Sequence, residues 1–253
     1  MALANDPVLY ERRGVAAVLT INRPEARNAV NGAAAAALLD GYRRFEDDAD
    51  AKVLVLTGAG DEAFCAGADL KAIDTVRDRH EGPLGFTRLT ATKPTIAAVS
   101  GWCVAGGLEL ALWCDLRIAA EGSTFGCFER RFGVPLIDGG TQRLPRIVGL
   151  GRALEIMMTG RPVPLEEAYR IGLVNEVVPH GQHLVRALAL AEALARFPWP
   201  TLLADRAAAL AGSGVPLEHG LAIEARLGRA VLEEAKRGAA RFAAGEGRKG
   251  LGT

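Results

Sequence analysis

The fold is decided by the stretch Pro94–Ala119, PTIAAVSGWCVAGGLELALWCDLRIA. It begins with a short apolar run, continues through a glycine-containing loop into a leucine-rich segment, and ends with a second apolar run. Short apolar runs bounded by glycine are typical of strands that are buried on both faces. We therefore predict a strand over Pro94–Val99, a helix over Gly106–Trp113 and another strand over Leu116–Ala119.

The same alternation extends toward the amino terminus. Strands are predicted at Gly14–Ile21 and Lys52–Thr57, with a helix between them over Asn31–Phe45. The second half of the chain is predicted to be mostly helical, because apolar residues recur there at helical spacing. These segments are Thr141–Val148, Arg152–Thr159, Leu165–Ile171, Leu184–Arg196 and Leu217–Lys236. Strands alternating with helices, followed by helices alone, predict an α/β protein with a twisted sheet core.

Composition limits the class of protein. The 253 residues fit one α/β unit, and the 49% hydrophobic content is enough for a sizeable core. Thirty basic and thirty acidic residues cancel, so charge gives no reason to expect nucleic acid or a membrane as partner. The amino terminus lacks the pattern of a signal peptide, and no apolar run reaches the roughly 18 residues that span a bilayer. We expect a cytoplasmic protein.

Metal and disulfide chemistry is not indicated. The two closest histidines, His180 and His183, have no thiol nearby, and such a pair is more typical of surface or helix-end histidines than of a metal site. The cysteines form no Cys-x-x-Cys pair, which predicts reduced thiols. They are Cys65, Cys103, Cys114 and Cys127.

Two glycine-containing loops each follow a predicted buried strand. They are FCAGADL, Phe64–Leu70, and GWCVAGGLE, Gly101–Glu109. Small residues allow the backbone to approach a ligand, and the amides at the start of a helix have no partner within the helix. Loops at the ends of neighbouring strands could each direct one N–H at a single oxygen. The pattern therefore suggests an oxyanion hole.

Two glutamates accompany these loops. Glu109 lies in the first turn of the predicted helix, where the positive helix end favours the ionised form of a general base. Glu129 lies in FGCFERRFG, Phe125–Gly133, where burial against phenylalanines would raise its pKa and suit it to donating a proton. Taken singly, Glu109 is more typical of a capping or solvated residue, and Glu129 of a surface ion pair. The hypothesis of an acid and a base rests on the whole constellation.

These segments resemble the crotonase (enoyl-CoA hydratase/isomerase) superfamily, in the order that the superfamily has them. The resemblance implies a crotonase-like ββα spiral core with the active site over residues 1–195. It also implies a helical carboxy-terminal region over residues 196–253, which completes the CoA site and builds homotrimers or hexamers that are dimers of trimers. The matching motifs are NRPEARNAVN (Asn22–Asn31), FCAGADL, KPTIAAVSGWCVAGGLELALWCDLRIA (Lys93–Ala119) and FGCFERRFGVPLIDGGTQRLPRIVG (Phe125–Gly149), with looser similarity through Ala153–Pro179.

By this resemblance, the amides of Ala68 and Gly106 form the oxyanion hole for a thioester carbonyl. Glu109 and Glu129 match the two glutamates of the hydratase branch, which activate water and deliver a proton to the α carbon. No metal or separate cofactor is implied, because CoA is part of the substrate. The positions that match the CoA site are Arg27, Ala29, Ala66, Asp69 and Leu70, together with Phe242 and Lys249 in the tail.

The resemblance favours a 2-enoyl-CoA hydratase, a lyase acting on an acyl-CoA thioester. Alternatives are an enoyl-CoA or dienoyl-CoA isomerase, a dehydratase of a polar acyl-CoA, and a non-catalytic CoA-thioester binder, which the presence of both glutamates disfavours. The segment Lys71–Thr92, expected beside the acyl pocket, is polar and does not reveal the acyl chain length. From another class, Gly58–Ala63 matches the G-x-G-x-x-A dinucleotide fingerprint, but the residues after it do not continue as a helix.

Four residues depart from the pattern of the superfamily. Arg130 and Arg131 stand where aliphatic residues are common, Phe128 where proline is common, and Asp138 where a small residue is usual. Asp138 has two interpretations. It either caps the helix that begins near Gly139, or it provides a third carboxylate in the pocket, which would support isomerase chemistry or a polar acyl chain.

Overall fold

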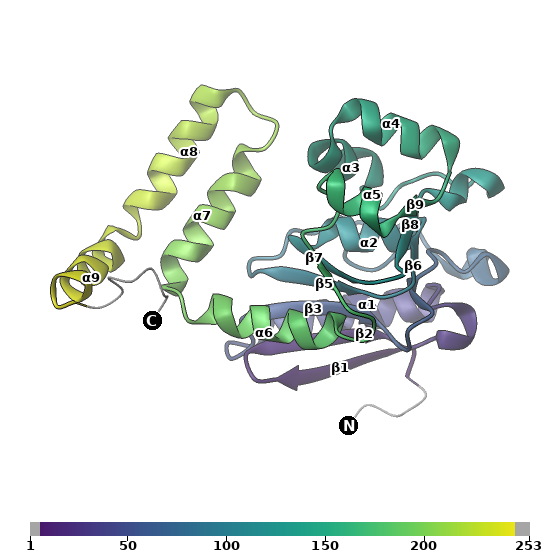
Figure 1. Ribbon diagram of the computed structural model, residues 1–253, viewed down its shortest axis with the longest axis horizontal. Helices are drawn as coiled ribbons and strands as arrows, with labels where there is room; N and C mark the ends of the chain where they lie inside the picture. The colour runs from purple at the N-terminus through teal and green to yellow at the C-terminus, as the bar shows by residue number, and fades with distance from the viewer. Residues whose placement is uncertain (1–5, 246–253) are drawn as a thin grey trace.

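The larger of two sheets has six strands in the order β1-β2-β3-β5-β7-β10 in the computed structural model, which describes residues 6–245 (Figure 1). The first pair, β1 and β2, is antiparallel, and the other neighbours are parallel. Parallel neighbours require crossover connections, which is why strands and helices alternate along the chain. The strands are β1 Val8–Arg13, β2 Ala16–Ile21, β3 Val53–Gly58, β5 Thr95–Val99, β7 Leu116–Ala120 and β10 Glu176–Val178.

The smaller sheet has four short strands in the order β4-β6-β8-β9. Each of β3, β5 and β7 in the large sheet is followed directly by one of β4, β6 and β8 in the small sheet. This arrangement confirms the ββα spiral implied by the motifs, and it brings the loops after successive strands to the same side of the molecule. The strands are β4 Ala63–Cys65, β6 Trp102–Val104, β8 Thr124–Gly126 and β9 Val163–Pro164.

Helices cover the sheets and extend beyond them (Figure 1). None of the helices within residues 6–245 is long and apolar enough to cross a membrane. The α-helices are α1 Gly32–Asp47, α2 Gly106–Trp113, α3 Gly140–Val148, α4 Leu150–Thr159, α5 Leu165–Arg170, α6 His183–Ala195, α7 Trp199–Gly212, α8 Leu217–Arg229 and α9 Leu232–Ala243. Three 3-10 helices are η1 Pro24–Ala26, η2 Leu70–Thr75 and η3 Phe128–Phe132.

Strand β3 shows why the central strands are continuously apolar. All six of its residues are buried. Leu54 and Leu56 belong to the main core, whereas Val53 and Val55 face the opposite way and pack in the cluster that α6 covers. Successive side chains of a strand point to opposite faces, so a strand with a core on each face needs apolar residues at every position.

Helix α2 is buried along its whole length and carries one charged residue, Glu109. Gly107 lets this helix approach β4, because a Cβ atom on Gly107 would stand 2.0 Å from the Cys65 carbonyl oxygen. A central helix without a solvent face has no amphipathic pattern, which is why its sequence reads as leucine-rich throughout. The fold thus holds one glutamate deep in the protein interior.

Most predicted elements are confirmed within a residue or two. One expectation was wrong: Leu217–Lys236 is not one helix but ends as α8 at Arg229 and resumes as α9 at Leu232. Helix α7 is absent from the predicted segments, because its sequence contains Pro200 and proline usually interrupts a helix. A proline in the first turn of a helix is favourable, since its missing N–H would have no partner there anyway, and Pro200 occupies this position.

The helices α7, α8 and α9 project from the rest of the molecule (Figure 1). Arg206 of α7 ties them to the core through an ion pair with Asp115 at 2.8 Å and a bond to the Ala91 carbonyl oxygen at 2.8 Å. The proposed boundary between residues 195 and 196 falls just after α6 and stays a prediction.

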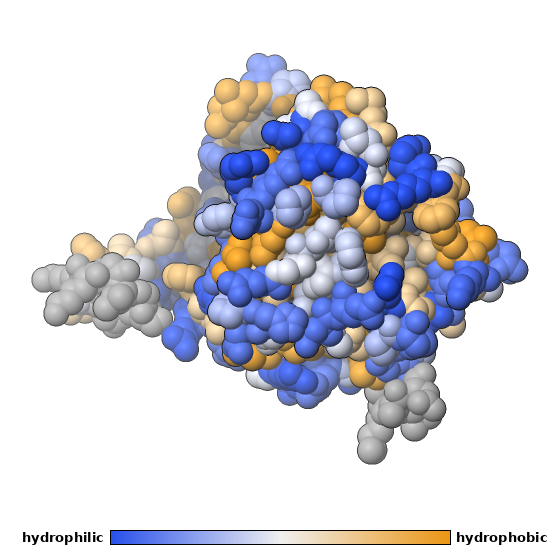
Figure 2. Space-filling view, turned by 45° about the vertical axis from the view of Figure 1, so that its right-hand side comes forward, coloured by the Kyte–Doolittle hydropathy of each residue, from blue (hydrophilic) through white to orange (hydrophobic). Residues whose placement is uncertain are grey.

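The surface is mixed in character. Figure 2 shows a face on which hydrophilic side chains predominate and hydrophobic ones gather in separate patches. This distribution is consistent with the balanced charge of the chain.

A matched pair of alanine substitutions tests the close approach of α2. Gly107→Ala should lower the free energy of unfolding by about 1–3 kcal/mol or more, because the new methyl group meets backbone that cannot move aside. Gly151→Ala in α4, where a Cβ atom meets open space, should raise it by up to about 1 kcal/mol. Urea unfolding followed by circular dichroism measures both, and equal stability of the two variants would contradict this packing.

Candidate active site

Two backbone amides meet beside α2. A Cβ atom on Gly67 would stand 2.8 Å from the Gly106 nitrogen, and one on Gly106 would stand 3.6 Å from the Ala68 nitrogen. Among the hydrogen bonds of residues 6–245, neither Ala68 N–H nor Gly106 N–H is a donor. The structure therefore places both predicted amides together, with their hydrogens free for a ligand.

Neighbouring backbone bonds hold the first of these amides in place. On one side Val30 N–H donates to the Gly67 carbonyl oxygen at 2.7 Å, and on the other Asp69 N–H donates to the Val30 carbonyl oxygen at 2.9 Å. The second amide follows Ala105, whose φ of 53° lies in the left-handed region that is costly for alanine. Strain of this kind persists where surrounding structure over-determines it, often at functional sites.

Glu109 extends from the first turn of α2 and accepts two backbone hydrogen bonds on one oxygen. Its Oε1 receives the N–H of Asp138 at 3.0 Å and that of Gly140 at 2.7 Å. Burial, with smaller contributions from the nearby Asp138 and Glu129 carboxylates, raises the pKa of Glu109 to about 8 against the effect of the two N–H donors. We expected the helix end to favour the ionised form. That expectation was wrong in its direction, because desolvation outweighs the helix end.

Glu129 lies in η3 and is also buried, but without donors. Neither of its carboxylate oxygens has a hydrogen-bond partner among the described residues. Burial raises the pKa of Glu129, whereas Arg130 lowers it. The interpretation of Glu129 as a surface ion pair is therefore excluded within residues 6–245, and a carboxyl group without partners is suited to meeting a substrate.

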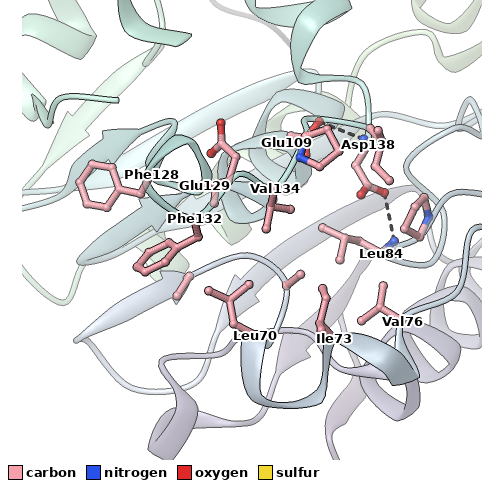
Figure 3. Close-up of a pocket in the computed structure, with 17 residues that line it drawn as sticks. Leu70, Ile73, Val76, Leu84, Glu109, Phe128, Glu129, Phe132, Val134 and Asp138 are labelled. Carbon is pink, nitrogen blue, oxygen red and sulfur yellow. Dashed lines mark hydrogen bonds between the residues drawn. The ribbon is translucent and has the colours of Figure 1, made fainter. Parts of the chain in front are cut away.

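Glu109 and Glu129 line one pocket together with Asp138 (Figure 3). The three carboxyl groups lie on one side of it, and Leu70, Ile73 and Val76 lie on the other. Much of the remaining lining is apolar, which favours an acyl chain. The residues that line the pocket are Ala66, Ala68, Leu70, Ile73, Val76, Pro83, Leu84, Ala105, Gly106, Glu109, Phe128, Glu129, Phe132, Val134, Pro135, Ile137 and Asp138.

The residues assigned to CoA by resemblance lie in several places. Ala66 and Leu70 line the pocket. Arg27 is exposed and pairs with Glu62 at 2.7 Å, and its carbonyl oxygen accepts the Ala66 N–H at 3.0 Å, so it adjoins the pocket through the backbone. Ala29 is buried outside the pocket lining.

Asp69 has a structural partner that the sequence did not reveal. Its carboxylate pairs with Arg23 at 2.9 Å and also accepts the Lys71 N–H at 3.1 Å. Arg23 donates to the Ala29 carbonyl oxygen as well. The Asp69 side chain therefore joins two loops beside the free amides.

One of the two tail positions, Phe242, is not among the residues that line this pocket. Phe242 lies exposed on α9, in the part of the chain that projects from the core. Lys249 lies outside the described residues. The carboxy-terminal contribution to CoA binding stays a prediction.

Asp138 is a pocket residue and not a helix cap. Helix α3 begins after Gly139 without a side-chain cap, whereas Asp138 Oδ1 accepts the Leu84 N–H at 3.0 Å and the Thr87 hydroxyl. Sequence analysis missed Leu84 and Thr87, because they lie in an irregular segment where spacing carries no signal. Arg143, also missed, donates to the carbonyl oxygens of Asp138 and Thr87 at 2.9 and 2.6 Å.

The residues that depart from the pattern anchor η3. The Arg131 guanidinium lies 4.1 Å from the centre of the Phe128 ring and donates to the Gly160 carbonyl oxygen at 3.1 Å. Arg130 donates to the Met157 carbonyl oxygen at 3.4 Å. These contacts fasten η3 to the end of α4 and so fix the segment that carries Glu129.

Other candidate sites find no support among residues 6–245. No cluster of histidine, cysteine and acidic residues could hold a metal, and His183, which begins α6, is buried. The four cysteines are free and buried. The dinucleotide fingerprint fails because β3 is followed by a bend and β4 instead of a helix.

Comparison with known proteins identifies the family. Residues 11–249 match enoyl-CoA hydratase/isomerase. The chain belongs to this family. It is 38% identical over 224 residues to the (E)-benzylidenesuccinyl-CoA hydratase of Thauera aromatica, covering 85% of this chain and 86% of the relative. It is 37% identical over 230 residues to the crotonyl-CoA hydratase of Syntrophomonas wolfei, covering 88% of each chain.

A solved structure of the enoyl-CoA hydratase/isomerase family has the same fold. The crystal structure of the enoyl-CoA hydratase EchA1 from Mycobacterium marinum matches with a TM-score of 0.89 and 38% identity, covering 95% of this chain and 96% of that one. The superfamily and fold expected from the motifs are therefore confirmed.

The raised pKa of Glu109 predicts a stability effect that depends on pH. A group whose pKa is higher in the folded than in the unfolded state stabilises the fold at low pH, and this contribution is lost as pH rises toward the folded value of about 8. Glu109→Gln keeps an acceptor oxygen and cannot ionise. It should therefore melt at a higher temperature than the wild type at pH 8.5, and at a similar temperature at pH 5, by differential scanning calorimetry.

The control for this experiment is Glu121→Gln, which changes an exposed glutamate in the turn after β7. It should leave the melting temperature unchanged at both pH values. A Glu109→Gln variant that melts below the wild type at pH 8.5 would contradict the assignment of a costly buried charge.

Proposed function

We propose that this protein is an enoyl-CoA hydratase, which adds water across the 2,3 double bond of an enoyl-CoA thioester. The observation that carries the proposal is the placement of two buried carboxyl groups, Glu109 and Glu129, in one largely apolar pocket with the free amides of Ala68 and Gly106. Several relatives that share most of the chain carry the name of a CoA-ester hydratase, which supports the same chemistry.

The two amides would bind the thioester carbonyl oxygen. Attack at the β carbon moves negative charge onto this oxygen, which gives an enolate-like state. Donors that already point at the oxygen stabilise that charge without reorganising, and one such donor typically contributes about 2.7–4 kcal/mol of barrier lowering. Ala68 follows β4 and Gly106 follows β6, and these two strands are neighbours in the small sheet, so the fold itself fixes the separation of the two amides.

The two glutamates would carry the protons. Ionised Glu109 takes a proton from water as the water oxygen bonds to the β carbon, and protonated Glu129 gives a proton to the α carbon. Water is thereby added in full, and one proton returns from Glu109 to Glu129 before the next turnover. The pKa of Glu109 is raised to about 8, so in the free pocket the shared proton rests on Glu109, and the proposed reaction requires it to pass to Glu129 when substrate binds. The two N–H donors on Glu109 would stabilise the anion that this transfer leaves.

Assembly and location form a second part of the proposal. We expect a homotrimer, or a hexamer made of two trimers, in the cytoplasm. Apolar side chains exposed on the projecting helices support assembly, because water would otherwise cover them. They are Leu210, Leu217, Leu221 and Leu232, and Phe242 beside them is the tail residue expected at a CoA site. Addition of water is redox-neutral, so the reaction calls for no cofactor beyond the CoA of the substrate.

Two conservative substitutions test the roles of the glutamates. Glu109→Gln and Glu129→Gln should each lower kcat for hydration of crotonyl-CoA by about 100- to 10,000-fold, because each removes one proton transfer. The loss of absorbance of the conjugated thioester gives the rate, and mass spectrometry of the product distinguishes hydration from isomerisation. Glu121→Gln serves as the surface control. Unchanged turnover in both pocket variants would refute the mechanism, whereas a wild type that binds crotonyl-CoA without turning it over would favour a non-catalytic CoA-thioester binder.

The pH dependence of kcat/KM should show that the two glutamates share one proton. The proposed reaction needs one proton on the two glutamates together, and Glu129 is among the charges that raise the pKa of Glu109, so we expect the two to titrate as a pair. Because the pKa of Glu109 is raised to about 8, kcat/KM should fall above about pH 8 as the last proton leaves. Initial rates at constant ionic strength, with the melting temperature measured at each pH to exclude unfolding, provide the check. A flat profile from pH 7 to pH 10 would rule out the shared proton.

A further inference from the structure

Asp138 adds a third carboxyl group to the pocket, beside the two glutamates that the proposed reaction uses (Figure 3). Only 4% of this residue is exposed. A carboxylate withdrawn from water is costly unless donors satisfy its oxygens. The hydrogen-bond partners of the two Asp138 carboxylate oxygens therefore decide what the residue can bind.

One oxygen is satisfied by the loop that faces it. Oδ1 accepts both the Leu84 N–H, at 3.0 Å, and the Thr87 hydroxyl. Within residues 6–245, both hydrogen bonds to the carboxylate end on Oδ1, and none reaches Oδ2. The carboxylate is thus fixed in orientation and retains one acceptor oxygen for a group inside the pocket.

Positive charge near Asp138 is already supplied by the protein. Arg143 donates to the Asp138 carbonyl oxygen at 2.9 Å, and Arg88 donates to the Ile137 carbonyl oxygen at 3.2 Å. Burial raises the pKa of Asp138, whereas the bonds from Thr87 and Leu84 and the charges of the two arginines lower it. With two guanidinium groups on adjacent carbonyls, a neutral donor suits the free oxygen better than another cation.

The position of Asp138 relates it to a definite part of the substrate. Its own N–H donates to Glu109 Oε1 at 3.0 Å, so it lies immediately beyond the glutamate that would hold water at the β carbon. Carbons of the acyl chain past the double bond would therefore come next to Oδ2. An alkyl group there would remove water from this oxygen and give no donor in return, which a buried acceptor penalises.

We propose that Asp138 is a specificity-determining residue, which selects an acyl group carrying a hydroxyl beyond the β carbon. This inference rests on the proposed hydration and narrows its substrate class to hydroxylated enoyl-CoA thioesters. The hydroxyl donates to Oδ2, while the apolar wall of Leu70, Ile73 and Val76 packs against the carbon chain.

Matched substrates test the proposal, because a hydroxyl and a methyl group differ little in size. The pairs are 4-hydroxybut-2-enoyl-CoA with pent-2-enoyl-CoA, and 5-hydroxypent-2-enoyl-CoA with hex-2-enoyl-CoA. The wild type should favour the hydroxyl member of at least one pair by about tenfold or more in kcat/KM, as expected for a hydrogen bond to a charged acceptor. Asp138→Ala should reduce this ratio to within about twofold of unity.

A second variant and a control separate selection from structural support. Asp138→Asn keeps the shape of the side chain and an acceptor for the Leu84 N–H, and should give an intermediate ratio. If Asp138 only supported the structure, its substitution would slow the reaction of both members of a pair equally and leave the ratio of their kcat/KM values unchanged. Val134→Ala enlarges the pocket without removing the Asp138 carboxyl group and should retain the wild-type ratio.

Two results would overturn the inference while leaving the proposed hydration intact. One is a wild-type enzyme that hydrates the alkyl member of both pairs as well as or better than the hydroxyl member. The other is a preference for the hydroxyl that survives in Asp138→Ala. If the wild type hydrates none of the four thioesters or crotonyl-CoA, the proposed function fails as well.

Discussion

Withdrawal of carboxyl groups from water is the constraint on which the site depends. Glu109, Glu129 and Asp138 share one pocket, and among the described residues none of them forms an ion pair. Low polarity and mutual repulsion both favour the protonated forms, so the group keeps a proton at a pH where a solvated carboxyl group would have lost it. A pocket with this property can supply an acid and a base at the same time, which is what addition of water to a double bond needs.

The two-sheet architecture both buries these carboxyl groups and positions the groups of the site. Strands β3, β5 and β7 of the large sheet each continue into a strand of the small sheet, so the loops that follow lie side by side. Glu109 reaches the pocket from a helix with no solvent face, and the amide of Gly106 begins the same helix. The proposed base and one proposed oxyanion donor therefore belong to a single rigid element, and a shift of α2 would move both together. Stability and the proposed catalysis are opposed at this point, because the buried glutamate that the proposed reaction needs is costly to the fold when it ionises.

The polar contacts around Asp138 show how one residue can contribute both to the structure of the pocket and to the proposed function. Its backbone orients Glu109, and its carboxylate is tied to the loop that carries Leu84 and Thr87. A member of the family with a small residue at this position would lack the second link. An aspartate at this position thus brings a charge into the pocket and also joins two of its walls. We expect the effect of this residue to appear in which acyl groups the pocket accepts.

The sequence by itself determined the alternation of strands and helices, the superfamily and the identity of the two glutamates. Burial on both faces forces a continuous apolar run in β3 and β5, and close approach forces small residues beside Ala68 and Gly106, so both leave a pattern in the chain. Only the tertiary structure decided the direction of the Glu109 pKa shift, the position of Asp138 in the pocket and the partners of Asp69. These depend on segments 29, 51 and 46 positions apart that meet in space, as in the bonds of Glu109 with Asp138, Asp138 with Thr87, and Arg23 with Asp69. The local spacing of residues in the sequence does not encode such contacts. Solvation and electrostatic interactions depend on distances in the folded molecule and not on separation along the chain.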